Sequence, residues 1–207
     1  GLVGYWTFDG KDTNWATNKT NDLSGNGNTG TMVSMSTTTS PVKGKMGQGL
    51  KFDGVNDKVK MSTDVGTISN GTFTISAWFN TRSLSYINVG AFVSGSGVFY
   101  PSFGIRSTKK LTLASAGQTY VATANTTLIA NKWYHGAVTY DGSNWSFYLN
   151  GISDGSGTTA QSFTSSNTVI GSYNLDSTFF EGTLDDVRVY NRVLSATKIK
   201  QLYNMGR

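Results

Sequence analysis

The chain has no cysteine, one histidine, one glutamate and two prolines among its 207 residues. Without cysteine no disulfide framework can form, and a CxxC metal or redox motif is excluded. A single histidine also excludes a metal site with two histidine ligands. The length is nevertheless sufficient to bury a hydrophobic core without such cross-links.

Charged residues are scarce as well, at 14% of the chain against roughly 25% in average soluble domains. Serine, threonine, asparagine and glycine take their place, which is typical of exported modules and indicates an extracellular or cell-surface location. The 17 basic and 12 acidic residues give a net charge of +5. Because the basic residues are scattered, no nucleic acid is expected as a partner, whereas an acidic polysaccharide or an anionic cell surface would suit the charge.

Long apolar runs are also missing, since no segment approaches the ~20 residues that span a bilayer. We therefore expect no membrane insertion. The sequence starts at Gly1 without a signal peptide and shows no break in composition. These features indicate one domain over residues 1–207, monomeric in isolation and excised from a larger protein.

Alternation of apolar and polar residues is the dominant pattern, and it predicts an all-β domain of the sandwich or barrel kind. In the last predicted strand it places Leu184 with Asp186, Arg188 and Tyr190 on one face, opposite Asp185, Val187 and Val189. Asn150-Gly151 predicts a type I′ hairpin turn. The expected strands cover 72–79, 133–140, 145–149 and 184–190.

One segment, Ser195 to Asn204, has helical periodicity. Ser195 is a suitable N-cap, and Ile199, Leu202 and Tyr203 form an apolar stripe. The Ser/Thr-rich stretch Ser34–Ser40 is expected to be a long loop.

Seven blocks of the sequence carry a resemblance to a known family: residues 4–9, 22–30, 49–54, 73–78, 132–142, 148–151 and 180–195. In this order they resemble laminin-G-like jelly-roll domains of the concanavalin A-like lectin/glucanase superfamily. The resemblance implies an antiparallel jelly-roll β-sandwich of two sheets with roughly six or seven strands each, one sheet concave, and with the terminal strands paired. The helical segment described above adds one short C-terminal helix. It implies no particular ligand, because members include glycan binders, protein binders and structural modules.

The sequence lacks the residue patterns that common hydrolytic sites require. Retaining glycoside hydrolysis needs two carboxyl groups ~5 Å apart, but the only glutamate, Glu181, has no carboxylate at positions 179 or 183. Alternation directs Asp185 and Asp186 to opposite faces of their strand. His135 lies within a predicted strand without a nucleophile motif, so a structural role is expected for it. We therefore predict that the chain is not an enzyme.

Oxygen-rich side chains favour a structural Ca²⁺ ion. The loop that begins at Asp22 supplies carboxylate and amide oxygens together with glycines that let carbonyl groups turn inward. The resemblance places a calcium ion near the paired terminal strands, with Asp9, Asp22, Asn28 and Asp185 as the best candidate ligands. The same loop can also be a glycine-rich turn capped by its Asp and Asn side chains.

Several aromatic residues fall outside the predicted core positions and are candidates for stacking on a sugar ring. They suggest two alternative binding sites. One is the concave sheet, with Tyr100, Arg106 and Tyr120, and the other is the loop rim, with Trp15 and Trp145. The concave sheet is favoured because strands hold side chains more rigidly than loops. Tyr86 and Tyr173 are also unexplained by the core pattern.

These observations predict a non-catalytic extracellular binding module, carbohydrate-binding or adhesive, with a structural calcium ion. Its expected partner is a glycan or a cell-surface polysaccharide, and a protein partner is the other option. The alternative is a protein-interaction or spacer module without glycan affinity. An enzyme that cleaves glycans ranks third.

Overall fold

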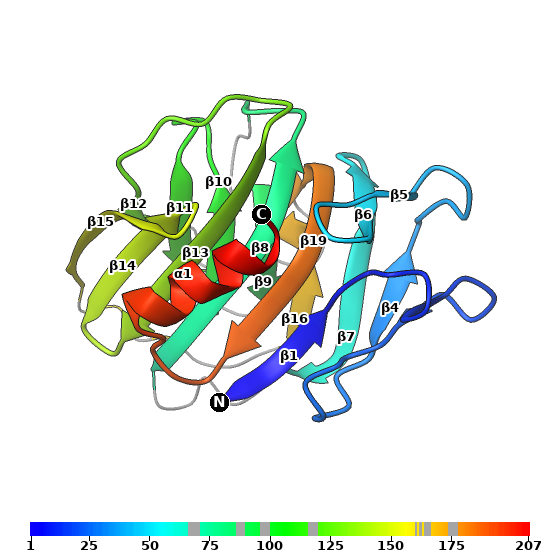
Figure 1. Cartoon of the computed structure of the whole chain (residues 1–207), viewed down its shortest axis with the longest axis horizontal. Helices are drawn as coiled ribbons and strands as arrows, with labels where there is room; N and C mark the ends of the chain where they lie inside the picture. The colour runs from blue at the N-terminus through cyan, green and yellow to red at the C-terminus, as the bar shows by residue number, and fades with distance from the viewer. Residues whose placement is uncertain are drawn as a thin grey trace.

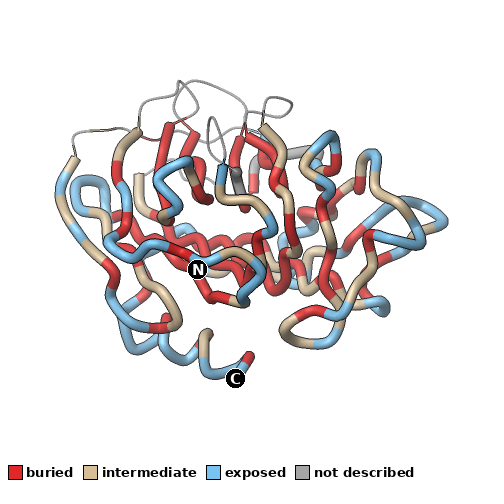
Figure 2. The backbone as a smooth tube through the Cα atoms, turned by 90° about the horizontal axis from the view of Figure 1, so that it is seen from above, coloured by how far each residue is buried: buried red, intermediate tan, exposed pale blue. Residues whose placement is uncertain are grey.

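The computed structural model describes residues 1–65, 71–85, 90–95, 100–115, 120–159, 161, 163, 167–173 and 178–207. Two antiparallel sheets pack face to face in this part of the chain (Figure 1). Their buried segments lie between the layers and exposed residues concentrate in the connections (Figure 2). The β-sandwich predicted from the sequence is confirmed.

The first sheet has the strand order β15-β14-β13-β8-β19-β6-β5, and β1 also pairs with β19. The two terminal strands of the chain are thus paired, as the resemblance implied. The bounds are β1 Leu2–Trp6, β5 Pro41–Lys43, β6 Gln48–Asp53, β8 Thr72–Thr81, β13 Trp133–Asp141, β14 Asn144–Leu149, β15 Ile152–Thr158 and β19 Glu181–Tyr190.

Within the described residues, the second sheet has nine strands in the order β12-β11-β10-β9-β16-β7-β4-β3-β2. With eight and nine strands, the two sheets are larger than the six or seven strands each that the resemblance implied, because short edge strands such as β2, β3 and β5 extend them. Two short strands, β17 (Ser172–Tyr173) and β18 (Thr178–Phe179), pair with each other. The bounds are β2 Thr13–Asn14, β3 Lys19–Thr20, β4 Gly30–Val33, β7 Lys58–Asp64, β9 Gly90–Gly95, β10 Pro101–Ile105, β11 Leu111–Ser115, β12 Tyr120–Thr123 and β16 Asn167–Ile170.

Strand alternation supplies the core between the sheets. Phe73, Ile75 and Phe79 of β8 all point into it, as the sequence predicted. Phe79 stacks on Phe92 of the opposite sheet with ring centroids 4.4 Å apart. Contacts of this kind join the layers, because aromatic side chains bury a large area and pack in defined orientations.

A β-bulge interrupts alternation in β19. The register shifts between Asp185 and Arg188, and Asp186 adopts a positive φ of 51°. Leu184, Val187 and Val189 therefore all lie in the core. The predicted division of this strand into two faces is wrong, because a bulge adds one residue and reverses the alternation after it.

Helix α1 (Ala196–Met205) covers the outer face of the first sheet (Figure 1). The side chain of Ser195 accepts a hydrogen bond from the Lys198 N–H at 3.3 Å, which confirms the predicted N-cap. Ile199 and Leu202 are buried, and the Tyr203 ring stacks on Trp78 of β8 with centroids 5.5 Å apart.

The hairpin between β14 and β15 turns at Asn150-Gly151, with φ of 53° and 74°. Two successive positive φ values define the predicted type I′ turn.

Two glycines with positive φ differ in their surroundings and provide a test of the packing. A Cβ on Gly171 (φ +85°) would lie 2.2 Å from the Phe52 ring, whereas a Cβ on Gly142 (φ +104°) would meet nothing within 4 Å. We expect Gly142→Ala to cost about 1 kcal/mol of strain, and Gly171→Ala a further ~1–3 kcal/mol from overpacking. Urea unfolding measures both, and equal losses would contradict the packing around Phe52.

Candidate functional site

A surface pocket of about 590 Å³ opens beside β2 and β3, at one end of the nine-stranded sheet. Its walls carry one aromatic ring, together with hydroxyl, amide and ammonium groups, and include no carboxylate. We call it the Trp15 pocket. Its lining residues are Gly10, Lys11, Thr13, Asn14, Trp15, Thr17, Lys19, Asn21 and Thr29.

Local hydrogen bonds hold the turn that presents Trp15. The Asn14 Oδ1 accepts the backbone N–H groups of Ala16 at 3.0 Å and Thr17 at 3.1 Å. This Asx turn fixes the chain around the indole. The indole is half-buried and packs against the core, so the pocket has a rigid aromatic wall.

Two further groups shape the polarity of the Trp15 pocket. Thr13 is only 7% exposed, and its Oγ1 has no hydrogen-bond partner among the described residues. Lys19 donates a 2.6 Å hydrogen bond from Nζ to the Thr31 Oγ1. The pocket therefore combines cationic charge with hydroxyl and amide groups that can bind a polar ligand.

Tyr100 does not lie on an open surface, so this part of the predicted concave site is wrong. The residue is 1% exposed, and its hydroxyl is 2.8 Å from the Thr168 Oγ1. Its ring covers Gly95, where a Cβ would approach within 2.3 Å. The missing side chain at Gly95 gives the ring a place in the core.

Arg106 and Tyr120, the other two candidates for the sheet site, contact each other. The guanidinium carbon lies 3.0 Å from the centroid of the Tyr120 ring. Tyr120 is half-buried and also packs against Ala114 and Tyr173. One face of the ring is thus already used by the arginine, in a cation–π contact.

Trp145 is a packing residue of the sheet. It pairs across the strands with Gly157, and a Cβ at Gly157 would lie 2.5 Å from the indole. Its ring also contacts Phe147, with centroids 5.4 Å apart. Tyr173 is 2% exposed, whereas Tyr86 lies outside the described residues.

Asp22 caps its own loop with both carboxylate oxygens. Oδ1 accepts the N–H groups of Tyr5 and Ser24, each at 2.9 Å. Oδ2 accepts the Asn28 N–H at 2.9 Å and the Ser24 hydroxyl at 2.8 Å. The Asn28 amide in turn donates to the Val3 carbonyl at 2.8 Å. This geometry matches the alternative of a capped glycine-rich turn, and it ties the loop to β1.

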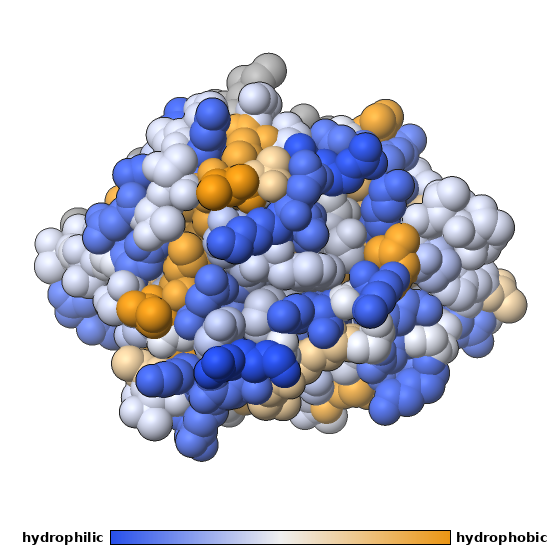
Figure 3. All heavy atoms as spheres, turned by 45° about the horizontal axis from the view of Figure 1, so that its top comes forward, coloured by the Kyte–Doolittle hydropathy of each residue, from blue (hydrophilic) through white to orange (hydrophobic). Residues whose placement is uncertain are grey.

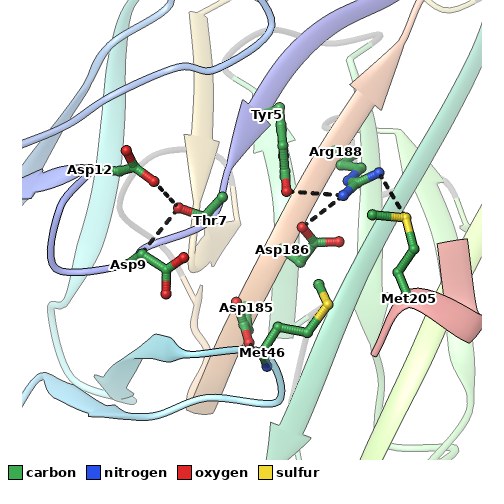
Figure 4. A network of polar contacts seen from close by, with 9 residues as sticks. All are labelled: Tyr5, Thr7, Asp9, Asp12, Met46, Asp185, Asp186, Arg188 and Met205. Carbon is green, nitrogen blue, oxygen red and sulfur yellow. Dashed lines mark hydrogen bonds and ion pairs between the residues drawn. The ribbon is translucent and has the colours of Figure 1, made fainter. Parts of the chain in front are cut away.

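Asp9 and Asp185 lie elsewhere, at the turn formed by residues 44–48 (Figure 4). The Asp9 Oδ1 accepts the Gln48 N–H at 2.9 Å, and the Asp185 Oδ2 accepts the Met46 N–H at 2.8 Å. The four predicted calcium ligands thus form two separate pairs, Asp22 with Asn28 in one loop and Asp9 with Asp185 at this turn. Within the described ranges, no three His, Cys, Asp or Glu side chains group closely enough to hold a metal.

Asp185 and its neighbour Asp186 lie in different electrostatic surroundings. The neighbouring Asp186 forms a buried ion pair with the Arg188 Nη2 at 3.0 Å, and the same Nη2 donates to the Tyr5 hydroxyl at 3.0 Å (Figure 4). Burial, with the charges of Asp186 and Asp9 adding to it, raises the pKa of Asp185 to about 7. A carboxyl group in this state is stabilised by a proton or by a cation.

His135 lies in a closed layer beneath α1. It is 1% exposed, its ring packs edge-on against Trp78 at 5.3 Å, and burial beside Arg188 lowers its pKa to about 3. Ser76, Trp78, His135 and Arg188 each have one buried polar atom without a hydrogen-bond partner in the described chain. Because α1 covers this layer, it is closed to a saccharide.

Two carboxylates of the described chain face each other on the first sheet, and both make other contacts. Glu181 is directly opposite Asp53 across the β6–β19 ladder, a partner that inspection of a single strand could not find. The Asp53 Oδ1, however, accepts the N–H groups of Val55, Asn56 and Asp57 and caps that turn. Glu181 lies 4.0 Å from the Arg82 Nε.

The sequence model of the concanavalin A-like lectin/glucanases superfamily, in its laminin-G-like form, matches residues 53–200. This is most of the chain, so the chain belongs to that superfamily. A comparison with curated proteins finds no match.

Solved structures share the fold along nearly the whole chain. Domain 4 of AbnA, an extracellular arabinanase from Geobacillus stearothermophilus solved with arabinotriose, is 20% identical with a TM-score of 0.73 and 98% coverage of both chains. The binding domain of Paraclostridial Mosquitocidal Protein 1 is 16% identical with a TM-score of 0.72, over 99% of this chain and 52% of that one.

The receptor-binding domain of botulinum neurotoxin type G is 18% identical with a TM-score of 0.69, over 99% of this chain and 51% of that one. The chain thus spans about half the length of each toxin domain. At these identities the likeness establishes the fold. No helix within the described ranges has the length and hydropathy of a membrane span.

The raised pKa of Asp185 predicts a pH-dependent stability. Between pH ~4, where an unfolded aspartate titrates, and pH about 7, the folded state binds more protons than the unfolded state. The contribution of Asp185 to the free energy of unfolding is therefore complete below this window and is lost as pH rises through it. Asp185→Asn, an uncharged isostere, should lack this loss.

Urea unfolding in chelating buffer at several pH values, for the wild type and for Asp185→Asn, measures the difference. His135 and Asp57, whose pKa values are also shifted, are present in both proteins and largely cancel. Parallel pH profiles would show that Asp185 does not titrate in this window.

Proposed function

We propose that this chain is a non-catalytic extracellular carbohydrate-binding module whose ligand occupies the Trp15 pocket. The observation that carries the proposal is a half-buried indole set among hydroxyl, amide and ammonium groups in an open pocket of about 590 Å³. This volume lies within the range of about 300–1,000 Å³ that is usual for ligand sites.

The chemistry of a sugar matches these walls. A pyranose or furanose ring has an apolar C–H face that packs on a flat indole, and hydroxyl groups around its edge that donate and accept hydrogen bonds. Asn21 provides both donors and acceptors, whereas the Asn14 Nδ2 and Lys11 provide donors, because the Asn14 Oδ1 already accepts two backbone N–H groups. The wall at Trp15 is fixed before binding, which reduces the entropy lost on association.

The two sites predicted from the sequence are not equally favoured. On the sheet, Tyr100 is buried and Tyr120 is stacked on Arg106. On the rim, Trp145 covers Gly157, whereas Trp15 faces a polar pocket. The proposal therefore places the ligand at Trp15 and moves the preferred site from the sheet to the rim.

Similar structures support a binding role. The arabinanase domain was solved with arabinotriose, and two toxin relatives are named as a binding domain and a receptor-binding domain. The low charge content adds support for an extracellular location. Glu181 beside Arg82 and the turn-capping Asp53 favour a module without hydrolytic activity.

A protein-interaction or spacer module is the alternative. Hydrophobic residues on the face drawn in Figure 3 form small groups separated by hydrophilic ones. The exposed large hydrophobic residues come from different segments of the chain: Leu23, Val55, Ile129, Ile152, Val193 and Met205. Scattered exposure of this kind is ordinary for a protein surface and favours no apolar docking face.

A structural calcium ion is a second part of the proposal, now narrowed to Asp9 and Asp185. Asp22 and Asn28 are engaged in their own loop, whereas Asp9 and Asp185 approach the same glycine-containing turn. Carboxylate oxygens are the donors that Ca²⁺ prefers. A cation there would compensate for the burial of the Asp185 carboxylate, the main cause of its raised pKa, and for the nearby charges of Asp186 and Asp9.

Replacement of Trp15 by alanine should weaken glycan binding. We expect Trp15→Ala to weaken the best ligand from a glycan array by at least about tenfold, the loss of a ~1.4 kcal/mol contact. Trp145→Ala, which removes an indole that packs over Gly157, is the matched control and should retain affinity once folding is verified. Binding lost only in Trp145→Ala would refute the assignment, and an array without any hit would favour the interaction or spacer module.

Calcium should stabilise the fold through Asp185. At ~100 times its dissociation constant the ion adds about 2.7 kcal/mol to the free energy of unfolding. Thermal unfolding in excess calcium and in EDTA measures this increment. It should vanish in Asp185→Asn and persist in Asp22→Asn. An unchanged midpoint in the wild type would argue against a bound ion.

A further inference from the structure

Four residues from four neighbouring strands form a continuous row on the outer face of the nine-stranded sheet. Asn14 of β2 pairs with Lys19 of β3, Lys19 pairs with Thr31 of β4, and Thr31 pairs with Lys60 of β7. Directly paired residues project from the same face of a sheet. The 2.6 Å hydrogen bond from Lys19 to Thr31 confirms this for the middle pair. We call these four residues the basic row.

The basic row connects two pockets. Asn14 and Lys19 line the Trp15 pocket, whereas Thr31 and Lys60 line a second pocket of about 340 Å³ together with Val33, Met61 and Asn167. Because Lys19 is bonded to Thr31, the polar wall is continuous from one pocket to the other. Three strand spacings of ~4.8 Å separate Asn14 from Lys60, which gives a track of about 14 Å.

The charged residues among those that line the two pockets are all lysines. Lys11 and Lys19 line the first pocket and Lys60 lines the second, and no Asp or Glu is among the lining residues of either. Lys19 and Lys60 are both exposed. Lys58 lies two residues from Lys60 on the same strand, and its ammonium group is 5.9 Å from the centre of the Phe179 ring. The local field therefore favours an anionic ligand, with flexible ammonium groups as its partners.

We propose that the ligand is an acidic glycan, which lies across the basic row with one ring on Trp15 and its acidic groups near Lys19 and Lys60. This inference rests on the proposed function and names the chemical class of its ligand. The walls carry threonine and asparagine side chains with one aromatic ring. Grooves for single-stranded nucleic acids instead stack successive bases on several aromatic rings, so a glycan fits this track better.

Titration calorimetry with oligogalacturonates and their fully methyl-esterified forms tests this inference, because the two probes share a backbone and differ in charge. A heparin oligosaccharide tests sulfate groups as well. The wild type should bind at least one acidic probe and bind the neutral ester more weakly. Affinity should fall with salt and should rise from the monosaccharide to short oligomers that span the row.

Substitution of single lysines shows which of them contribute to binding of the acidic probe. Lys19→Gln and Lys60→Gln should each weaken the acidic probe roughly two- to fivefold, as expected for an exposed ion pair. Lys198→Gln, an exposed lysine on α1, is the matched control and should not change the affinity. Equal affinity for the acid and its ester, or equal effects of Lys60→Gln and Lys198→Gln, would overturn the inference.

The outcomes separate this inference from the proposed function. If a neutral glycan binds through Trp15 and the lysine variants bind it normally, the carbohydrate-binding function holds and the acidic ligand is wrong. If neither neutral nor acidic glycans bind, both fail. Tighter binding of oligothymidylate than of any acidic glycan would overturn the inference in favour of a nucleic acid.

Discussion

The ladder β13-β8-β19 is covered on both faces, and most other features of the structure depend on it. Its inner face carries Phe79 and the hydrophobic core, while its outer face carries Trp78 and His135 beneath α1. Burial on both sides leaves no room for exposed charge, so Arg188 and Asp186 form an ion pair. This region is therefore built for stability, and its buried ion pair is closed to a ligand.

The opposite end of the sandwich has the properties that binding requires. Strands β2, β3 and β4 are short, and residues on their outer face remain exposed, among them Asn14 and Lys19. The Asx turn at Asn14 fixes Trp15 without committing its indole to another aromatic ring. A rigid scaffold that presents polar and aromatic groups at its rim is a common arrangement for recognition.

The sequence predicted long strands well and local exceptions poorly. Alternation identified β8, β13 and β14, and the capping serine identified the start of α1, because these signals depend on neighbouring residues alone. It failed at the bulge of Asp186, which shifts the register by one residue, and at Tyr100, whose ring packs over Gly95 at the end of the preceding strand. Trp15 was among the candidates, but the lysines beside its pocket were not, because only strand pairing brings Lys19 and Lys60 into one row.

The position of the bound glycan is the most direct test of the account. The five tryptophans give five indole N–H signals in a nitrogen-15 NMR spectrum, which can be followed during titration with an oligogalacturonate. We predict that the Trp15 signal shifts most, together with the backbone amides of Lys19 and Thr31, while Trp78 beneath α1 is unaffected. A Trp15 signal that stays in place while those of Trp145 or of the Arg106–Tyr120 region shift would contradict the account.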